Sequence, residues 1–274
     1  MEEEYKMKVF ISCDIEGITT TTTWSETHTQ SEPAIAAAHA RQMTAEVKAA
    51  CEGAIAAGAD YILVKDAHGS GTNIDVTQLP ECVEVQRNWT GHPYGMAQGV
   101  ESQRFDAAMF VGYHNAAGRD GNPLSHTMTL APLWIKINGV KTSEFMLYSW
   151  ACALEGTPTV FLAGDDQLCT DSAALHPMLK TVSVKKGDAS ATRSISPSLA
   201  CKLIREESEK ALRQDLSQAM CQLPQKFTVQ ICYRDHHKAT KMSYYPGFKK
   251  IEDNIIEFKT KDLFEVLRAM QFVL

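Results

Sequence analysis

Hydrophobic residues are concentrated in short runs along the chain, and polar or amphipathic stretches separate these runs. Four runs have the composition of buried strands: Val9–Ile11, Tyr61–Val64, Ala107–Tyr113 and Thr159–Ala163. The first two flank an Ala-rich stretch at 33–57, which has apolar residues at helical spacing and is followed by Gly58, a residue typical of helix C-caps. Buried strands that alternate with helices predict an α/β fold with a mostly parallel sheet flanked by helices.

Shorter elements are expected in the middle of the chain. The pattern predicts a strand at 83–85 and a short helix at 95–102. Asn138-Gly139 lies between two apolar segments and predicts a hairpin, because both residues readily adopt the positive φ angles of a tight turn. Glu144 follows this hairpin, at the start of a helix that we expect to reach about Leu154.

The C-terminal part has a different pattern. We expect helices near 198–217 and 261–270 and strands near 227–232 and 255–258, so strands and helices do not alternate regularly there. This order predicts a smaller α+β subdomain over residues 191–274, after an α/β domain over residues 1–190. No Gly/Ser linker marks the boundary, so one continuous unit is the alternative.

The composition is that of a sizeable globular protein, with 274 residues, 44% of them hydrophobic, and a formal net charge of -6. The acidic balance and the lack of a basic, aromatic-rich block argue against nucleic acid as a partner. The chain opens with Glu2-Glu3-Glu4 rather than a secretory signal, and no apolar stretch approaches the roughly 20 residues of a membrane-spanning helix. We therefore expect a soluble, cytoplasmic protein without a membrane partner.

Eight cysteines are scattered along the chain without a Cys-x-x-Cys pair. Their spacing argues against a zinc ribbon and against a thioredoxin-type redox site. Cys13 adjoins Asp14, but the alternation of side chains along a strand points its thiol away from that carboxylate. We expect Cys13 to pack in the core.

Residues that bind metals follow three of the predicted strands. Asp14 and Glu16 follow the first, Asp66 and His68 end the second, and His114 ends the third. Each of these is, by itself, most often an ordinary cap or surface group. The carboxyl ends of parallel strands meet at one edge of a sheet, however, and carboxylates and imidazoles gathered there predict a site for zinc or another transition metal. A cation would relieve the repulsion between the two carboxylates of the first strand, and Asp66 would fix the tautomer of His68.

Further candidates have open roles. His126 follows Ser125 after a glycine-rich turn and suits a general base, a nucleophile or part of a capping pair. Glu144 starts a helix, where a carboxylate also interacts favourably with the helix dipole. Asp165 and Asp166 end the fourth strand and are either a further wall of the site or helix caps.

These motifs resemble the DppA-type zinc D-aminopeptidase family in their order and spacing. The likeness spans nearly the whole chain, and its Ser-x-Asp-x-Glu-Gly opening is fairly specific. It depends on the segments Ser12–Gly17, Lys65–His68, Gly112–His114, Ser125–Met128, Glu144 and Ala163–Asp166. The run Thr20–Thr23, the loop around Trp24, the His236-His237 pair and much of the chain after residue 225 depart from the family pattern, so metal binding is better supported than substrate preference.

The resemblance implies two zinc ions per chain. In this arrangement Asp14 bridges the metals, and Glu16, His68, His114 and Glu144 are the other ligands. His126 occupies the position of the family's proposed catalytic residue. The resemblance also implies a ring-like homo-oligomer, which is a decamer in the family's best-known form.

The leading hypothesis is hydrolysis of the amide bond at the free N-terminus of a short peptide. A metal-activated water attacks the carbonyl, and His126 transfers the proton to the departing amine or attacks directly. The preference for D-amino acids comes from the resemblance alone. Two rivals stay open. One is another binuclear hydrolase such as a phosphoesterase, which a clamp of arginine and lysine would favour, but the sequence shows no basic cluster near these motifs apart from Lys65 and Arg119. The other is a metabolite-binding α/β module without turnover.

Overall fold

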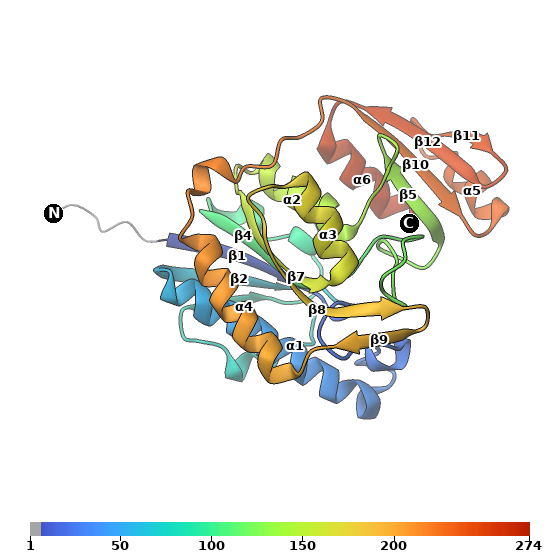
Figure 1. Ribbon diagram of the computed structural model, residues 1–274. Coiled ribbons are helices and arrows are strands. Elements are labelled where there is room, and N and C mark those ends of the chain that lie inside the picture. The colour runs from blue at the N-terminus through green and yellow to red at the C-terminus, as the bar shows by residue number, and fades with distance from the viewer. Residues whose placement is uncertain (1–6) are drawn as a thin grey trace.

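The computed structural model describes residues 7–274, which fold around two sheets (Figure 1). The strands of the larger sheet are β1 (Met7–Cys13), β2 (Ala59–Asp66), β3 (Val83–Gln86), β4 (Ala107–Tyr113), β7 (Thr159–Asp165), β8 (Lys180–Asp188) and β9 (Ala191–Ser194). Their order is β3-β2-β1-β4-β7-β8-β9, and β9 alone is antiparallel to its neighbour. The expected α/β fold with a mostly parallel sheet is confirmed. Glu2-Glu3-Glu4 lies outside the described residues.

Helices cover both faces of this sheet. Helices α1 (Pro33–Ala56) and α4 (Pro197–Leu212) pack against each other on one face, and α2 (Glu144–Leu154) and α3 (Asp166–Leu175) lie on the other (Figure 1). Alternate residues of β1 serve the two cores, because side chains along a strand point to opposite faces. Val9, Ile11 and Cys13 belong to the core beneath α1, and Phe10 belongs to the other core. The thiol of Cys13 is buried as expected.

The smaller sheet is antiparallel and has the order β11-β12-β10-β5-β6. Its strands are β5 (Pro132–Ile137), β6 (Val140–Lys141), β10 (Phe227–Tyr233), β11 (Lys249–Glu252) and β12 (Ile255–Thr260), and α5 (His236–Met242) and α6 (Leu263–Val273) accompany it. Asn138 and Gly139 form the expected hairpin turn with φ angles of 52° and 85°. The sheet thus combines strands from both sides of residue 190, and α4 packs against α1. The division at that residue stays a prediction.

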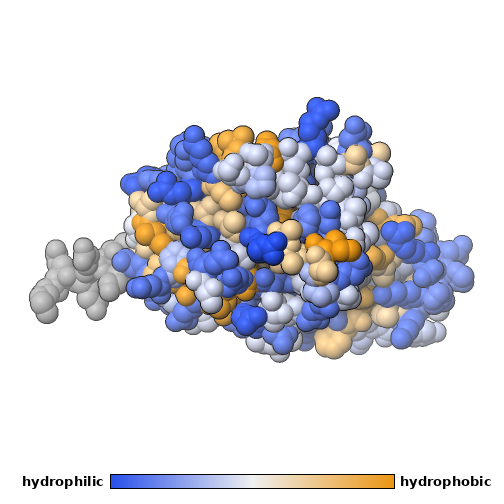
Figure 2. Space-filling view, turned by 90° about the horizontal axis from the view of Figure 1, so that it is seen from below, coloured by the Kyte–Doolittle hydropathy of each residue, from blue (hydrophilic) through white to orange (hydrophobic). Residues whose placement is uncertain are grey.

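Some expected elements differ in detail. The short helix expected at 95–102 consists of two 3-10 turns, Gly95–Ala97 and Val100–Ser102, because Gly99 between them adopts a left-handed conformation with φ 102°. The pattern also gave no indication of β8 and β9. Hydrophilic side chains cover much of the face seen in Figure 2. No helix in the described part of the chain combines the length and the apolar character needed to span a membrane.

Candidate metal centre

The predicted metal ligands converge at the carboxyl ends of β1, β2 and β4. Within the described residues, two groups of potential ligands have donor atoms within 4.8 Å of one another. Asp14, Glu16 and His68 form the first group, and His114, His126 and Glu144 form the second. The structure therefore brings all six of the predicted side chains to one site.

Asp14 connects the two groups. Its Oδ1 lies 3.2 Å from Nδ1 of His68, and its Oδ2 lies 3.5 Å from Nε2 of His114. Glu16 Oε2 is 3.1 Å from the same nitrogen of His68, and Glu144 Oε2 is 3.3 Å from the same nitrogen of His114. One carboxylate that faces two carboxylate–imidazole pairs has the geometry required of a bridging ligand.

Backbone carbonyl groups fix the orientation of the three histidines. His68 Nε2 lies 2.9 Å from the oxygen of Thr27, His114 Nδ1 lies 3.0 Å from that of Asn115, and His126 Nδ1 lies 2.9 Å from that of Leu124. A carbonyl oxygen only accepts hydrogen bonds, so each of these nitrogens donates. The opposite nitrogen of each ring therefore faces the centre, where it can bind a metal once it is deprotonated.

The expected role of Asp66 is wrong. Its carboxylate accepts hydrogen bonds from the backbone N–H groups of Asn73 and Ile74, at 2.5 and 2.9 Å, and from the side chain of Asn73. Asp66 therefore organises the loop after β2, and the carbonyl of Thr27 fixes the tautomer of His68 instead. The sequence could not identify Thr27, because a backbone carbonyl acts there and the residue type is irrelevant.

Burial and charge make this cluster suitable for cations. Asp14, Glu16, His114 and Glu144 are at most 3% exposed. Glu16 Oε2 and His114 Nε2 are buried without a hydrogen bond, a costly arrangement that bound metal would relieve. Burial and the neighbouring Glu16 raise the pKa of Asp14 to about 8. The donor set of carboxylate oxygens and imidazole nitrogens fits zinc.

His126 lies at the edge of the centre. Its Nε2 is 3.6 Å from Oε1 of Glu144, its ring stacks on His114 with the centroids 4.2 Å apart, and the edge of Trp24 packs against it at 5.4 Å. Burial and the positive charge of His114 lower the pKa of His126. The neutral imidazole that results can accept a proton through Nε2. The same nitrogen is also close enough to the second group to bind metal.

Neighbouring groups hold the ligands in place. Met128 donates its backbone N–H to Glu144 Oε1 at 2.6 Å, and the buried Lys185 of β8 donates to the carbonyl oxygens of Glu16 and Thr21. Only glycine fits at position 17, because a Cβ there would lie 1.8 Å from the carbonyl oxygen of Tyr113. Sequence reasoning missed Lys185, since only its burial reveals its role.

Asp165, the last residue of β7, has a structural role. Asp165 caps α3 by accepting from the N–H of Leu168 at 2.8 Å, and it also accepts from Asn115 and Asn122 in the loop after β4. Neither Asp165 nor Asp166 belongs to the two ligand groups found among the described residues. The capping alternative therefore describes Asp165, which stabilises the loop that carries His114.

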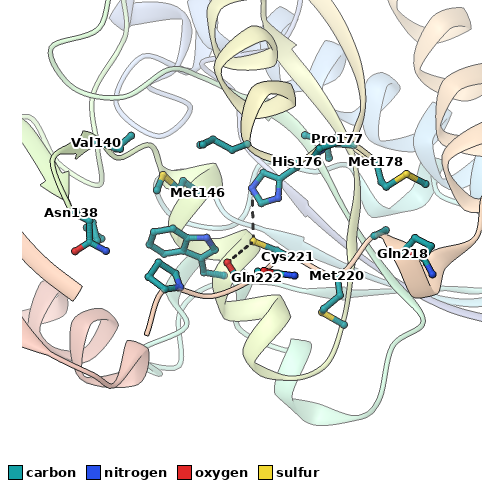
Figure 3. Close-up of a pocket in the computed structure, with 16 residues that line it drawn as sticks. Asn138, Val140, Met146, His176, Pro177, Met178, Gln218, Met220, Cys221 and Gln222 are labelled. Atoms are coloured by element: carbon teal, nitrogen blue, oxygen red, sulfur yellow. Dashed lines mark hydrogen bonds between the residues drawn. The ribbon is translucent and has the colours of Figure 1, made fainter. Parts of the chain in front are cut away.

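Two cavities are relevant to the chemistry. One of about 390 Å³ opens over Asp14, Glu16, His68, His126 and Glu144. A larger one of about 510 Å³ lies between α2, α3 and the segment before β10 (Figure 3). Its residues His176 and Cys221 face each other, but none of the described residues that line it is a carboxylate. Burial raises the pKa of Cys221 to about 11, so the thiol is protonated at neutral pH. The candidate catalytic and metal-binding groups line the smaller cavity.

Two comparisons with known proteins found matches over nearly the whole chain. The family model described as D-aminopeptidase matches residues 7–272. A solved structure, the Zn-dependent D-aminopeptidase DppA from Bacillus subtilis, described as a self-compartmentalizing protease, superposes with a TM-score of 0.87 at 25% identity, over 97% of this chain and 96% of that one. A search of curated protein sequences found no significant match. Because the family model covers nearly the whole chain, the protein belongs to the D-aminopeptidase family of peptidases.

Proposed function

We propose that this protein is a zinc-dependent aminopeptidase that removes the N-terminal residue of short peptides, with a preference for D-amino acids, at a site for two zinc ions. The position of Asp14 between two carboxylate–imidazole pairs carries this proposal. Asp14 would bridge the metals, Glu16 and His68 would hold one, and His114 and Glu144 would hold the other. When bound, a zinc pair supplies an activated water at neutral pH and a Lewis acid for the scissile carbonyl.

His126 has the proton-transfer role in this proposal. Its lowered pKa keeps the imidazole neutral, so Nε2 accepts a proton during attack and then delivers it to the departing amine nitrogen. The carbonyl of Leu124 keeps the Nδ1–H in place throughout. The nearby carboxylate of Glu144 stabilises the imidazolium that forms transiently.

A phosphoesterase is not favoured, because the described residues provide no basic clamp for a phosphate group beside the proposed metal site. No lysine or arginine lines the cavity over the metal centre among the described residues. Lys65 is buried and donates to the carbonyls of Asp66 and Asn88, and Arg119 is held by both carboxylate oxygens of Asp171. The two basic side chains that the sequence left available are therefore engaged elsewhere.

Assembly and location belong to the same proposal. We expect a ring-like homo-oligomer, with a decamer as the specific prediction, and a cytoplasmic location. The description of the Bacillus subtilis relative as a self-compartmentalizing protease supports assembly. Mass measurement of the native particle in solution tests it, and a monomer at working concentration would contradict it.

Metal analysis and a substrate panel test the proposed function. The purified protein is stripped with a chelator, reloaded with zinc, and assayed with para-nitroanilides of D- and L-amino acids and with para-nitrophenyl phosphate. We expect two zinc per chain, and hydrolysis of the D-anilides that disappears with the chelator and returns with zinc. Phosphate ester hydrolysis without peptidase activity, or no turnover with either substrate class, would overturn the proposal.

A further inference from the structure

The walls of the cavity over the metal centre are apolar. Trp89, Met96, Met128 and Met270 line it, and Leu274 adds to the same wall. The proposed metal ligands Asp14, Glu16, His68 and Glu144 line the same cavity together with His126. A peptide whose N-terminal amide lies at the metal centre would therefore place its first side chain against sulfur and indole surfaces.

These walls are fixed before any ligand binds. The indole N–H of Trp89 donates to the carbonyl of Gly69 at 2.8 Å, and the ammonium of Lys65 lies 4.1 Å from the centroid of the indole ring. The sulfur of Met128 accepts a hydrogen bond from the hydroxyl of Tyr148 at 2.9 Å. A preformed pocket loses little conformational entropy on binding, so contacts with the ligand add directly to affinity.

The C-terminal helix α6 completes the pocket. Met270 is 4% exposed and packs in the core shared with the smaller sheet, which fixes its position. Gln271 lies at the rim, where its amide nitrogen donates to the carbonyl of His92 at 2.9 Å. Helix α6 packs on β10 and β12, so the smaller sheet positions Met270 beside candidate ligands that follow strands of the larger sheet.

The charged residues that line the cavity affect which substrate side chains can bind. Its charged residues, among those described, are the carboxylates and histidines of the centre, and no lysine or arginine is present. An acidic substrate side chain directed at the apolar wall would lose its hydration without gaining a basic partner there. A methyl group would leave most of the roughly 390 Å³ to water, whereas a larger apolar side chain would displace that water from the thioether and indole surfaces.

We propose that Trp89, Met96, Met128 and Met270 form the specificity pocket for the substrate's N-terminal side chain, and that this enzyme prefers large apolar residues there over alanine and rejects acidic ones. The proposal depends on the proposed aminopeptidase function. Burying one methylene group in an apolar pocket is worth roughly 4-fold in affinity, and the leucine and methionine side chains each have three more heavy atoms than alanine. We therefore expect kcat/KM for D-leucyl and D-methionyl anilides to exceed that for the D-alanyl anilide by about 100-fold.

Two variants and one control test the pocket. Trp89→Ala should reduce the ratio of kcat/KM for D-leucyl over D-alanyl substrate about 10-fold while the zinc content stays unchanged. Gln271→Lys should raise kcat/KM for a D-glutamyl anilide about 5-fold by adding a cation at the rim. Phe272→Lys is the matched control, because this neighbour on α6 is 66% exposed and does not line the cavity. An equal gain in this control would contradict a local effect.

Binding separates this proposal from the proposed function. The zinc-loaded protein is titrated calorimetrically with D-leucinamide, D-alaninamide and D-glutamic acid α-amide. Tighter binding of D-leucinamide by 10-fold or more would support the pocket even if no anilide were hydrolysed, an outcome that would overturn only the peptidase assignment. Hydrolysis of the D-alanyl substrate at least as fast as the D-leucyl one would overturn the pocket and leave the peptidase standing.

Discussion

Replacing Asp14 with asparagine should change stability in opposite directions with and without zinc. In the metal-free protein, burial and the charge of Glu16 raise the pKa of Asp14 from 3.8 to about 8. Below pH 3.8 this carboxyl group is protonated in both the folded and the unfolded state and does not reduce the free energy of unfolding. As the pH rises from 3.8 toward 8, it increasingly lowers the free energy of unfolding. At pH 7 the folded protein retains a proton that the unfolded chain would release, a penalty of about 4 kcal/mol.

Asparagine has the same shape and removes this penalty, since its side-chain oxygen can still accept from the N–H of Ile15. We expect the metal-free Asp14→Asn variant to melt about 8 °C above the metal-free wild type at pH 7, at about 2 °C per kcal/mol. The difference should shrink toward pH 4. With zinc at about 1,000 times its Kd the wild type should gain about 4 kcal/mol, and the variant should gain almost nothing because a neutral amide cannot bridge two cations.

The assay is thermal unfolding at several pH values, with chelator and with zinc, beside metal analysis of each protein. Glu46→Gln is the matched control, because Glu46 is also buried, burial raises its pKa to about 7, and it contacts Thr19 rather than the ligands. This control should keep the wild-type response to zinc. Two zinc per chain and an undiminished zinc response in Asp14→Asn would refute the bridging role, and an unchanged pH profile would refute the protonation argument.

Further substitutions examine the groups around the ligands. His126→Ala should keep both zinc ions and lose about 100-fold or more in kcat, and the loss of one zinc would make His126 a ligand instead. Lys185→Met should weaken zinc binding about 10-fold in a chelator competition, because Lys185 donates to the carbonyl of Glu16. Lys186→Met, at the exposed neighbouring position, is the control and should leave zinc affinity unchanged. Equal zinc affinities of the two variants would limit Lys185 to a packing role. Cys13→Ser should retain zinc and activity, and a large loss of zinc would contradict its place in the core beneath α1.

The convergence of the candidate ligands could be predicted from one local signal and one rule of parallel sheets. Asp14, His68 and His114 each follow a run of buried β-branched or aromatic residues, and the parallel arrangement of those runs brings their ends together. Strand β8 was not predictable in the same way, because lysines interrupt its apolar residues and its neighbour β9 is short. Its position beside β7 depends on contacts that no local pattern contains.

The groups that orient the ligands were harder to predict for a physical reason. Thr27 and Leu124 act through backbone carbonyls, and Met128 acts through its backbone N–H. Every residue has these groups, so their use depends on the path of the loop and not on the side chain. Asp66 shows the opposite case, in which a side chain suggests a role that it does not have. Its carboxylate is close to His68 in sequence but accepts hydrogen bonds from the backbone of the following loop.

Both sheets contribute residues to the site. Asp14, Glu16, His68 and His114 follow strands of the larger sheet, whose core lies beneath well-packed helices. His126 and Met128 lie in the loop that leads into β5, and Met270 lies on α6, so the proposed proton-transfer group and part of the apolar wall depend on the smaller sheet. Glu144 follows β6 of the same sheet, whereas Trp89 and Met96 follow β3 of the larger one. Each sheet therefore contributes both to the proposed metal site and to the proposed pocket, and a change in the position of one sheet relative to the other should alter both.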